Sequence, residues 1–319
     1  MDEGARIKRL PTTFDAKSVG VYAQDLLQIA PTWKLLGGLH DDYLEGDYRN
    51  FASAITSATA VLGAQTAQRG RSDGLWSKRF GVLYQPTDNV SFHAPYGTSF
   101  NTSGDTDQCD DQTKNTAPEG SENFEAGAKV EALAGRLSTR VALFKSIKNN
   151  ERNRDPDSAA SAALQSGKRH TAGIEFNIDG RISDGWEVFG ADAWTPVARI
   201  DVGAPGSLAG VGEGAGARSS MTPRHSGSIW STWQRNPALR LGDGFNARSS
   251  QTPNRNPAGL VAPSVVTADL LAKYTVSETV AVKFNVLNLT NKLHADARYT
   301  GHYVPGAPRK LLMPVTSRF

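Results

Sequence analysis

Hydrophobic and polar positions alternate along residues 170–182, HTAGIEFNIDGRI. The even-numbered positions from Ala172 to Ile178 are mostly apolar, whereas the odd-numbered positions from Thr171 to Arg181 are mostly polar or charged. Successive side chains of a β-strand point to opposite faces of the sheet. The pattern therefore predicts a strand that separates an apolar environment from an aqueous one.

Similar alternation, interrupted by clusters of Gly, Pro, Asn and Asp, recurs along the chain and predicts thirteen strands. These strands are predicted at 18–29, 33–44, 76–85, 90–100, 122–133, 137–148, 170–182, 186–197, 224–234, 239–249, 264–276, 279–290 and 309–319. The connections alternate in length: short turns such as PTDN and SDG take turns with long polar stretches such as 45–75 and 291–308.

This alternation of short and long connections favours a membrane-spanning barrel over a soluble sandwich. Transmembrane β-barrels have short periplasmic turns and long extracellular loops, and each strand crosses the bilayer in about 9 to 11 residues. Backbone groups in hydrocarbon must be paired, so a spanning sheet closes on itself. Aromatic residues near the predicted strand ends suit interfacial girdles: Trp33, Trp76, Tyr84, Trp186, Trp233 and Phe319. The sequence predicts an all-β fold, a transmembrane antiparallel β-barrel with lipid on the apolar phase.

Composition narrows the function classes. The chain has 319 residues, of which 39% are hydrophobic, and its mean hydropathy is −0.41. No run approaches the roughly 18 apolar residues of a membrane helix. The formal charge is only +3, and Lys and Arg are spread along the chain, so no nucleic acid partner is expected. The single cysteine, Cys109, excludes an internal disulfide, and the N-terminus shows no apolar leader segment.

Several segments resemble the C-terminal half of TonB-dependent siderophore receptors, and within them the catecholate type. The resemblance covers residues 17–319 and is most specific at NLTNK near the end of the penultimate strand, at PGAPR before the last strand and at the terminal Phe319. Phe319 resembles the recognition signal for outer-membrane barrel assembly.

The resemblance implies the last thirteen or so strands of a 22-stranded barrel with a plug in its lumen, a size typical of plugged transporters. It further implies a receptor in the cell outer membrane that imports ferric siderophores with energy passed through TonB. The implied partners are a ferric siderophore, the TonB complex, the outer-membrane assembly machinery and outer-membrane lipid.

Other features of the sequence differ from those expected of this family. Residues 1–16 form a poorly defined segment, and nothing in the sequence resembles the plug domain or the first strands. Thirteen is an odd number, whereas bacterial single-chain barrels have an even one. The alternative is therefore a non-functional fragment of a decayed receptor gene. A weaker alternative is a soluble all-β binding protein.

Three acidic residues lie on the phase assigned to lipid: Asp41, Asp192 and Asp243. Acidic groups oppose insertion at such positions, although less than the roughly 2 to 4 kcal/mol of a midplane Arg or Lys. A bulge that shifts the phase by one residue would instead turn such a residue towards the lumen.

Candidate ligand-binding residues come from the predicted extracellular loops. Catecholate complexes of iron are anionic, and Arg and Lys bind anions through charge-assisted hydrogen bonds. The candidates are Arg152, Arg154, Lys168, Arg169, Arg218, Arg224, Arg248 and Arg255. A solvated loop charge is the alternative interpretation of each.

No motif in the sequence indicates catalysis, so no enzyme activity is expected. The six histidines have no close-spaced metal-binding pair, and no serine lies in a G-x-S-x-G elbow. The glycine-rich run 202–216 lacks the Lys-Ser/Thr ending of a phosphate-binding loop. Neither a metal nor another cofactor is predicted.

Overall fold

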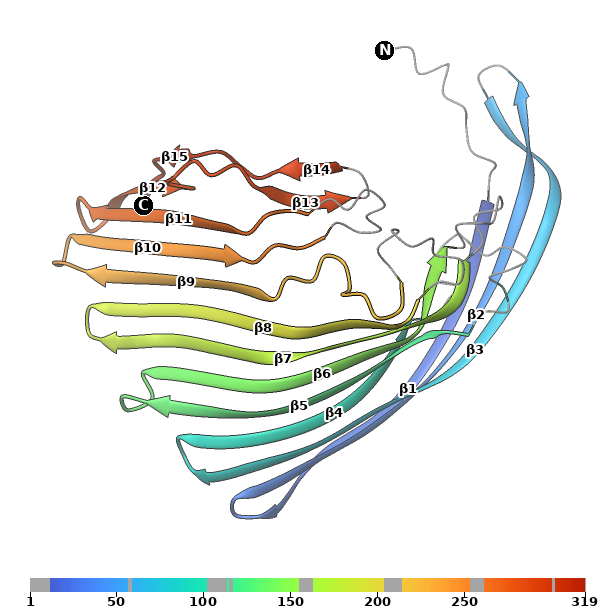
Figure 1. The fold of residues 1–319 in the computed structure, drawn as a ribbon, viewed down its shortest axis with the longest axis horizontal. Helices are drawn as coiled ribbons and strands as arrows, with labels where there is room; N and C mark the ends of the chain where they lie inside the picture. The colour runs from blue at the N-terminus through green and yellow to red at the C-terminus, as the bar shows by residue number, and fades with distance from the viewer. Residues whose placement is uncertain are drawn as a thin grey trace.

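A computed structural model shows that most of the chain forms one curved antiparallel sheet (Figure 1). It describes residues 12–56, 59–101, 114, 117–154, 163–203, 214–252, 261–299 and 302–318. Each strand from β1 to β12 pairs with its neighbours in sequence. Consecutive pairing follows from the short turns, which return the chain beside the strand that it has just left.

The sheet begins with β1 (Thr12–Ala30), β2 (Trp33–Thr56), β3 (Thr59–Thr87), β4 (Val90–Asn101), β5 (Glu119–Ala132), β6 (Leu137–Arg154), β7 (Ala163–Ser183) and β8 (Trp186–Val202). It continues with β9 (His225–Gln234), β10 (Leu239–Arg248), β11 (Val265–Thr275) and β12 (Val280–Leu287). All twelve overlap predicted strands. The fold class is therefore confirmed as all-β and antiparallel.

The thirteenth predicted strand forms as two short pieces, β15 (Lys310–Leu312) and β16 (Val315–Ser317), which both pair with β12. Pro314 lies between them. Proline has no N–H to donate to a ladder, but its carbonyl still accepts a bond from the Lys283 N–H at 2.9 Å. The interruption is therefore local, and the pairing resumes at Val315.

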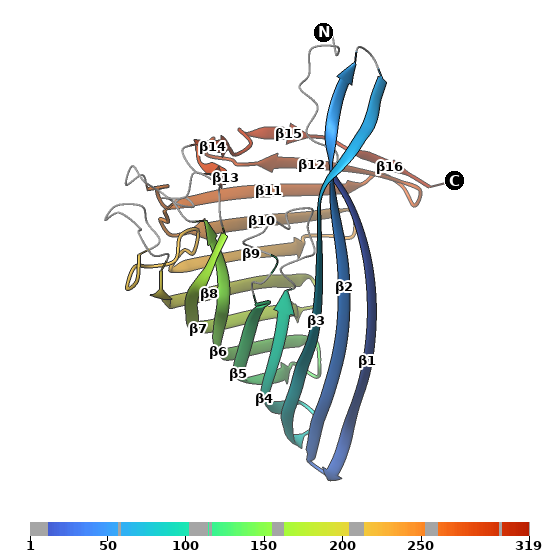
Figure 2. The same cartoon turned by 90° about the vertical axis from the view of Figure 1, so that its right-hand side faces the viewer.

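Two predicted connections contain strands. Most of the stretch 45–75 belongs to β2 and β3, which continue as a long hairpin beyond the other strands (Figure 2). The stretch 291–308 contains a separate two-stranded sheet of β13 (Ala295–Tyr299) and β14 (His302–Pro305). Strands that face water on both sides carry polar residues on both phases, so the apolar alternation that locates strands is missing there.

The cross-strand register places the apolar phase on one continuous face. Phe176 lies opposite Val141 on one side and opposite Asp192 on the other. Directly opposed residues point to the same side of a sheet. The same relation puts Asp41 beside Val21 and Trp76, and Asp243 beside Ser231 and Leu270. Hence all three acids lie on the apolar face, as predicted, and no phase slip occurs at them.

Aromatic side chains mark the end of this face that adjoins the short turns. The Trp33 and Tyr84 rings stack with centroids 4.5 Å apart, and the Phe92 ring follows 6.2 Å from Tyr84. Trp186 is paired with Trp233 farther along the sheet. These rows match an interfacial girdle, in which amphipathic rings sit at headgroup level.

No helix in the described residues has the length and hydropathy needed to cross a bilayer.

Candidate functional site

The opposite, inner face of the sheet is lined by polar side chains that bond across neighbouring strands. The Ser99 and Ser121 hydroxyls lie 2.6 Å apart, and the Ser146 hydroxyl donates to the Asn123 side-chain oxygen at 2.7 Å. Because these residues alternate with the apolar positions, their face is the one predicted to meet water. The inner face is therefore suited to line an aqueous lumen.

Towards the long-loop ends of β4–β7, this polar wall becomes a charged network. The Lys148 ammonium lies 3.3 Å from a Glu119 carboxylate oxygen and 3.7 Å from one of Glu151. The Arg169 guanidinium forms an ion pair with Glu151, and the Asn101 amide donates to Glu119 at 3.4 Å. Glu119 is 8% exposed. Ion pairs hold the two cations of this network in place, so their positions do not depend on a bound ligand.

A hollow of about 310 Å³ adjoins this network. Its lining residues come from β4, β5, β6 and β7 and include Ser99, Ser121, Lys148, Arg169 and His170. The His170 ring nitrogen Nδ1 lies 2.7 Å from an Asp201 carboxylate oxygen. The inner-face members of this lining offer hydroxyl, ammonium and guanidinium groups, a set that favours a polar, anion-bearing ligand.

Among the predicted ligand-binding residues, Arg169 lines this hollow. Lys168 precedes it in β7 with an exposed side chain and is not among the lining residues. Arg152 and Arg154 lie in β6, opposite Gln165 and Ala163. Arg255 and Phe319 lie outside the described residues.

Arg218 holds a segment of backbone. Its guanidinium donates to the carbonyls of Thr195 (2.6 Å), Pro196 (3.0 Å), Thr222 (3.1 Å) and Pro223 (3.2 Å). Burial, and after it the positive charge of Arg224, lowers the pKa of Arg218 from its ordinary value. The geometry therefore gives Arg218 the role of fastening the 217–224 segment to β8 at Thr195 and Pro196.

The two remaining candidates also contact backbone. Arg224 is exposed and donates to the Pro196 carbonyl at 3.3 Å. Arg248 is partly buried and donates to the Ala295 carbonyl at 2.7 Å, which connects β10 to β13. Thus the structure brings Arg218 and Arg224 together at Pro196 but places Arg248 elsewhere.

The sequence interpretation missed the acidic members of the network, Glu119 and Glu151, together with Lys148. The signal that would have found Glu119 and Lys148 is the inner phase of β5 and β6, continued to the long-loop ends of these strands, whereas Glu151 follows a register shift after Lys148 and lies outside that phase. Ser121 lies opposite Lys148, and both continue the row that begins lower in the sheet.

The single continuous sheet, its apolar face and its polar wall define a membrane-spanning β-barrel protein. The sequence matches the family described as "TonB dependent receptor-like, beta-barrel" over residues 4–289. The chain therefore belongs to the TonB-dependent receptor family, through the β-barrel of these receptors. Members of this family are outer-membrane β-barrel proteins, which favours the membrane barrel over the soluble all-β alternative.

Two curated relatives are named for siderophore uptake. The chain is 28% identical over 307 residues to the probable TonB-dependent siderophore receptor PiuA of Acinetobacter baumannii, covering 92% of this chain and 40% of PiuA. It is 27% identical over 324 residues to the catecholate siderophore receptor Fiu of Escherichia coli, covering 94% of this chain and 41% of Fiu. The chain thus spans about two fifths of the length of these relatives.

Solved structures agree with this fold. The closed form of Fiu, named as a ferric-catecholate import receptor, aligns with a TM-score of 0.80 at 24% identity, covering 97% of this chain and 45% of that one. The PiuA structure gives the same TM-score and identity over 95% of this chain and 44% of its own.

Proposed function

We propose that this chain forms the C-terminal part of the barrel wall of an outer-membrane receptor that imports ferric catecholate siderophores with energy passed through TonB. The observation that carries the proposal is the match along nearly the whole chain to PiuA and Fiu. In the complete receptor, siderophore, TonB complex and barrel-assembly machinery are the partners.

The inner wall supports an anionic ligand of this kind. A ferric catecholate carries negative charge and planar rings, which Arg recognises through charge-assisted bonds and stacking. Arg169 and Lys148 line the hollow at the long-loop end of the wall, where an extracellular ligand would enter. Both cations are paired with carboxylates, so an anionic ligand binds there in exchange for, or alongside, Glu151.

The same family likeness favours transport over catalysis, because the family consists of receptors and transporters. We extend this to the chain itself and propose that it catalyses no reaction.

Disruption of the gene that encodes this chain tests the function. The disrupted strain, grown under iron limitation, should lose uptake of radioactive iron supplied as a ferric catecholate and keep uptake of a ferric hydroxamate. Addition of a protonophore should abolish the difference between the two strains, since TonB transmits energy from the inner membrane.

Two other results would contradict the proposal. Loss of a different metal complex would point to another ligand, as for the metal-pseudopaline receptor CntO of Pseudomonas aeruginosa, which is 26% identical over 310 residues. Unchanged uptake of all complexes would favour the inactive-fragment alternative.

A further inference from the structure

The segments NLTNK and PGAPR, which lie on either side of a long connection, contact each other. NLTNK directly follows β12, and PGAPR directly precedes β15. The Asn288 side-chain amide donates to the Ala307 carbonyl at 3.0 Å, and the Arg309 N–H donates to the Asn291 side-chain oxygen at 2.9 Å. Two asparagines at the exit of β12 therefore hold the backbone that leads into β15.

Asn288 is itself held in one orientation. Its N–H donates to the Asp269 carboxylate of β11 at 2.7 Å. Its side-chain oxygen accepts from the Lys292 N–H at 2.8 Å, and its side-chain amide also donates to the Lys292 carbonyl at 3.0 Å. Asn288 is 6% exposed, and its φ of +49° is a conformation that asparagine adopts more readily than most residues. The bond to Ala307 thus comes from a fixed group.

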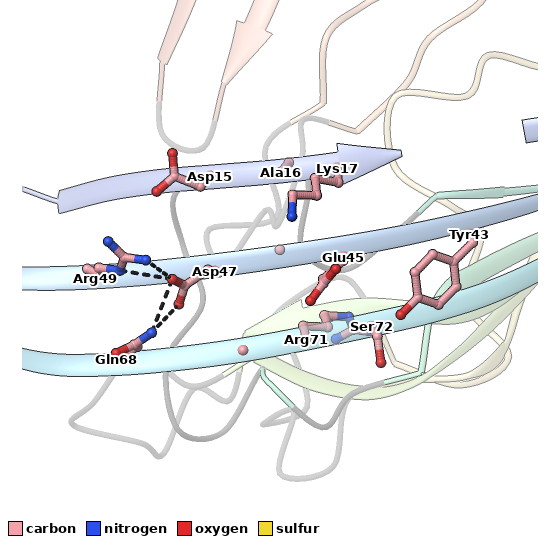
Figure 3. Close-up of a pocket in the computed structure, with 12 residues that line it drawn as sticks. Asp15, Ala16, Lys17, Tyr43, Glu45, Asp47, Arg49, Gln68, Arg71 and Ser72 are labelled. Carbon is pink, nitrogen blue, oxygen red and sulfur yellow. Dashed lines mark hydrogen bonds and ion pairs between the residues drawn. The ribbon is translucent and has the colours of Figure 1, made fainter. Parts of the chain in front are cut away.

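Pairing with β12 alone specifies the position of β15 and β16 weakly. Each of these two pieces makes only three pairs with β12, and Pro314 lies between them. By contrast, β2 and β3 pair along nearly their whole length, and the Gln68 side chain adds a bond to Asp47 across that pair (Figure 3). The connection 288–309 is also too long to fix a register in the way that a tight hairpin turn does.

The side-chain pattern of this last stretch does not select its register either. Leu311, Leu312 and Met313 are consecutive apolar residues. Leu311 lies opposite Val286. A slip of two residues keeps every side chain on its own face, and it would place Met313 opposite Val286, which is again an apolar pair. The contacts of the two asparagines are therefore what distinguishes the observed register from the slipped one.

This register matters for closure of the barrel. Within the described residues, β15 and β16 pair only with β12, so they form one edge of the sheet. A barrel closes only with a fixed stagger between its strands, and a slip at this edge would shift every pair made there. We propose that Asn288 and Asn291 form a latch that sets the register of β15 and β16 on β12 and thereby allows the barrel to close.

Disulfide trapping in outer membranes tests the register. The protein is produced from its own gene, with Cys109→Ser in every variant. Directly opposed residues of antiparallel strands lie within reach of a disulfide. Val286→Cys with Leu311→Cys therefore reports the observed register, and Val286→Cys with Met313→Cys reports a slip of two residues.

Asn288→Gly removes the carboxamide and still permits a positive φ. It loses three hydrogen bonds, each worth roughly fivefold in an equilibrium constant, so the ratio of observed to slipped crosslinks should fall by more than about tenfold. Asn150→Gly is the matched control. Asn150 of β6 also has a positive φ, 53°, and its side-chain amide donates to the Pro118 carbonyl at 3.2 Å, yet it has no bond to β15 or β16. The control should leave the ratio unchanged.

Asn291 provides an independent pair of variants. Asn291→Asp keeps the oxygen that accepts from Arg309 and should keep the ratio, whereas Asn291→Gly should lower it about fivefold. Equal ratios in Asn291→Asp and Asn291→Gly would contradict the part assigned to Asn291.

A rescue experiment separates register from general stability. Asn288→Gly should lower the fraction of protein that shows heat-modifiable mobility on gels. The oxidised Val286→Cys, Leu311→Cys pair should restore that fraction, because the disulfide fixes the register without the latch. An unchanged crosslink ratio in Asn288→Gly, an equal change in Asn150→Gly, a folding defect that persists in the oxidised pair, or absence of the wild-type protein from outer membranes would each overturn the proposal.

Discussion

Two arginines of this chain differ in role because their guanidinium groups meet different partners. Arg218 donates to four backbone carbonyls, whereas Arg169 pairs with the Glu151 carboxylate beside a hollow. Sequence reasoning placed both in one group of loop cations, since it relied on residue type and loop position. The carbonyls at 195–196 and 222–223 come together only when the 217–224 segment folds back on β8. That contact leaves no periodic signal in the sequence.

Replacing Arg169 tests its predicted role as a ligand contact. Arg169→Ala should weaken binding of an anionic ferric catecholate by about tenfold, since a hydrogen bond to a charged group contributes about 1.5–3 kcal/mol. Glu151→Gln keeps the cation and removes the carboxylate that competes for it, so binding should be unchanged or tighter. Retention of radioactive iron by outer-membrane vesicles measures both. Equal losses in the two variants would show that the ion pair matters only for structure.

Replacing Arg218 should instead affect the backbone around it. Lysine has one donor nitrogen and cannot reach four carbonyls, so Arg218→Lys should loosen the 214–224 segment by about 1–3 kcal/mol. Limited proteolysis of the folded protein should then cut this segment several-fold faster. Arg224→Lys is the control, because Arg224 is exposed and donates to a single carbonyl. Equal cleavage rates in the two variants would contradict the role assigned to Arg218.

Among the elements, strands within the apolar band were predictable and those beyond it were not. Each strand with an apolar face appeared at its predicted place, because one row of side chains such as Val141 and Phe176 had to be apolar. The outer parts of β2 and β3 carry charges on both faces: Asp47 points outward, while Arg71 and Asp73 form a buried ion pair on the inner side. Their pairing rests on specific contacts rather than on alternation. The network at Glu119 and Lys148 was missed because the candidates were sought only in the predicted loops and not on the inner phase of the strands.

The β2–β3 extension should depend on pH through Asp47. The Gln68 amide and then Arg49 lower the pKa of Asp47 below its ordinary value, because both bond to the charged carboxylate. A group whose pKa is lowered by folding stabilises the fold above its unfolded pKa, and this contribution is lost as pH falls through the folded pKa. Amide hydrogen exchange between 45 and 50 and between 67 and 72, corrected for intrinsic rates, should therefore accelerate below about pH 4.

Asp47→Asn provides the comparison for this pH dependence. The amide cannot ionise, so the variant should exchange faster than wild type at neutral pH, and the difference should shrink as the pH falls below about 4. A pH response that persists unchanged in Asp47→Asn would assign the effect to another group.

For the molecule as a whole, the order of the strands could be predicted from turn lengths, but the closure of the barrel could not. Figure 2 shows a curved sheet in which β1 forms one edge and β15 lies at the other. Within the described residues, β1 pairs only with β2, and β15 and β16 pair only with β12. The curvature follows from the right-handed twist of paired strands. Closure of the barrel depends on strands that pair with these two edges.

The two edges of the sheet, which lack a pairing partner within the described residues, lead to a prediction about assembly. In hydrocarbon each unpaired backbone group costs several kcal/mol, so an open sheet of this width is not stable in a bilayer. Residues 1–319 expressed alone behind a leader should therefore give no heat-modifiable band on gels of outer-membrane fractions. The same residues fused behind the N-terminal part of Fiu, whose structure they match with a TM-score of 0.80, should give one. A heat-modifiable band from residues 1–319 alone would mean that β1 and β15–β16 find partners within one copy or between copies, and the cost assigned to the open edges would then be wrong.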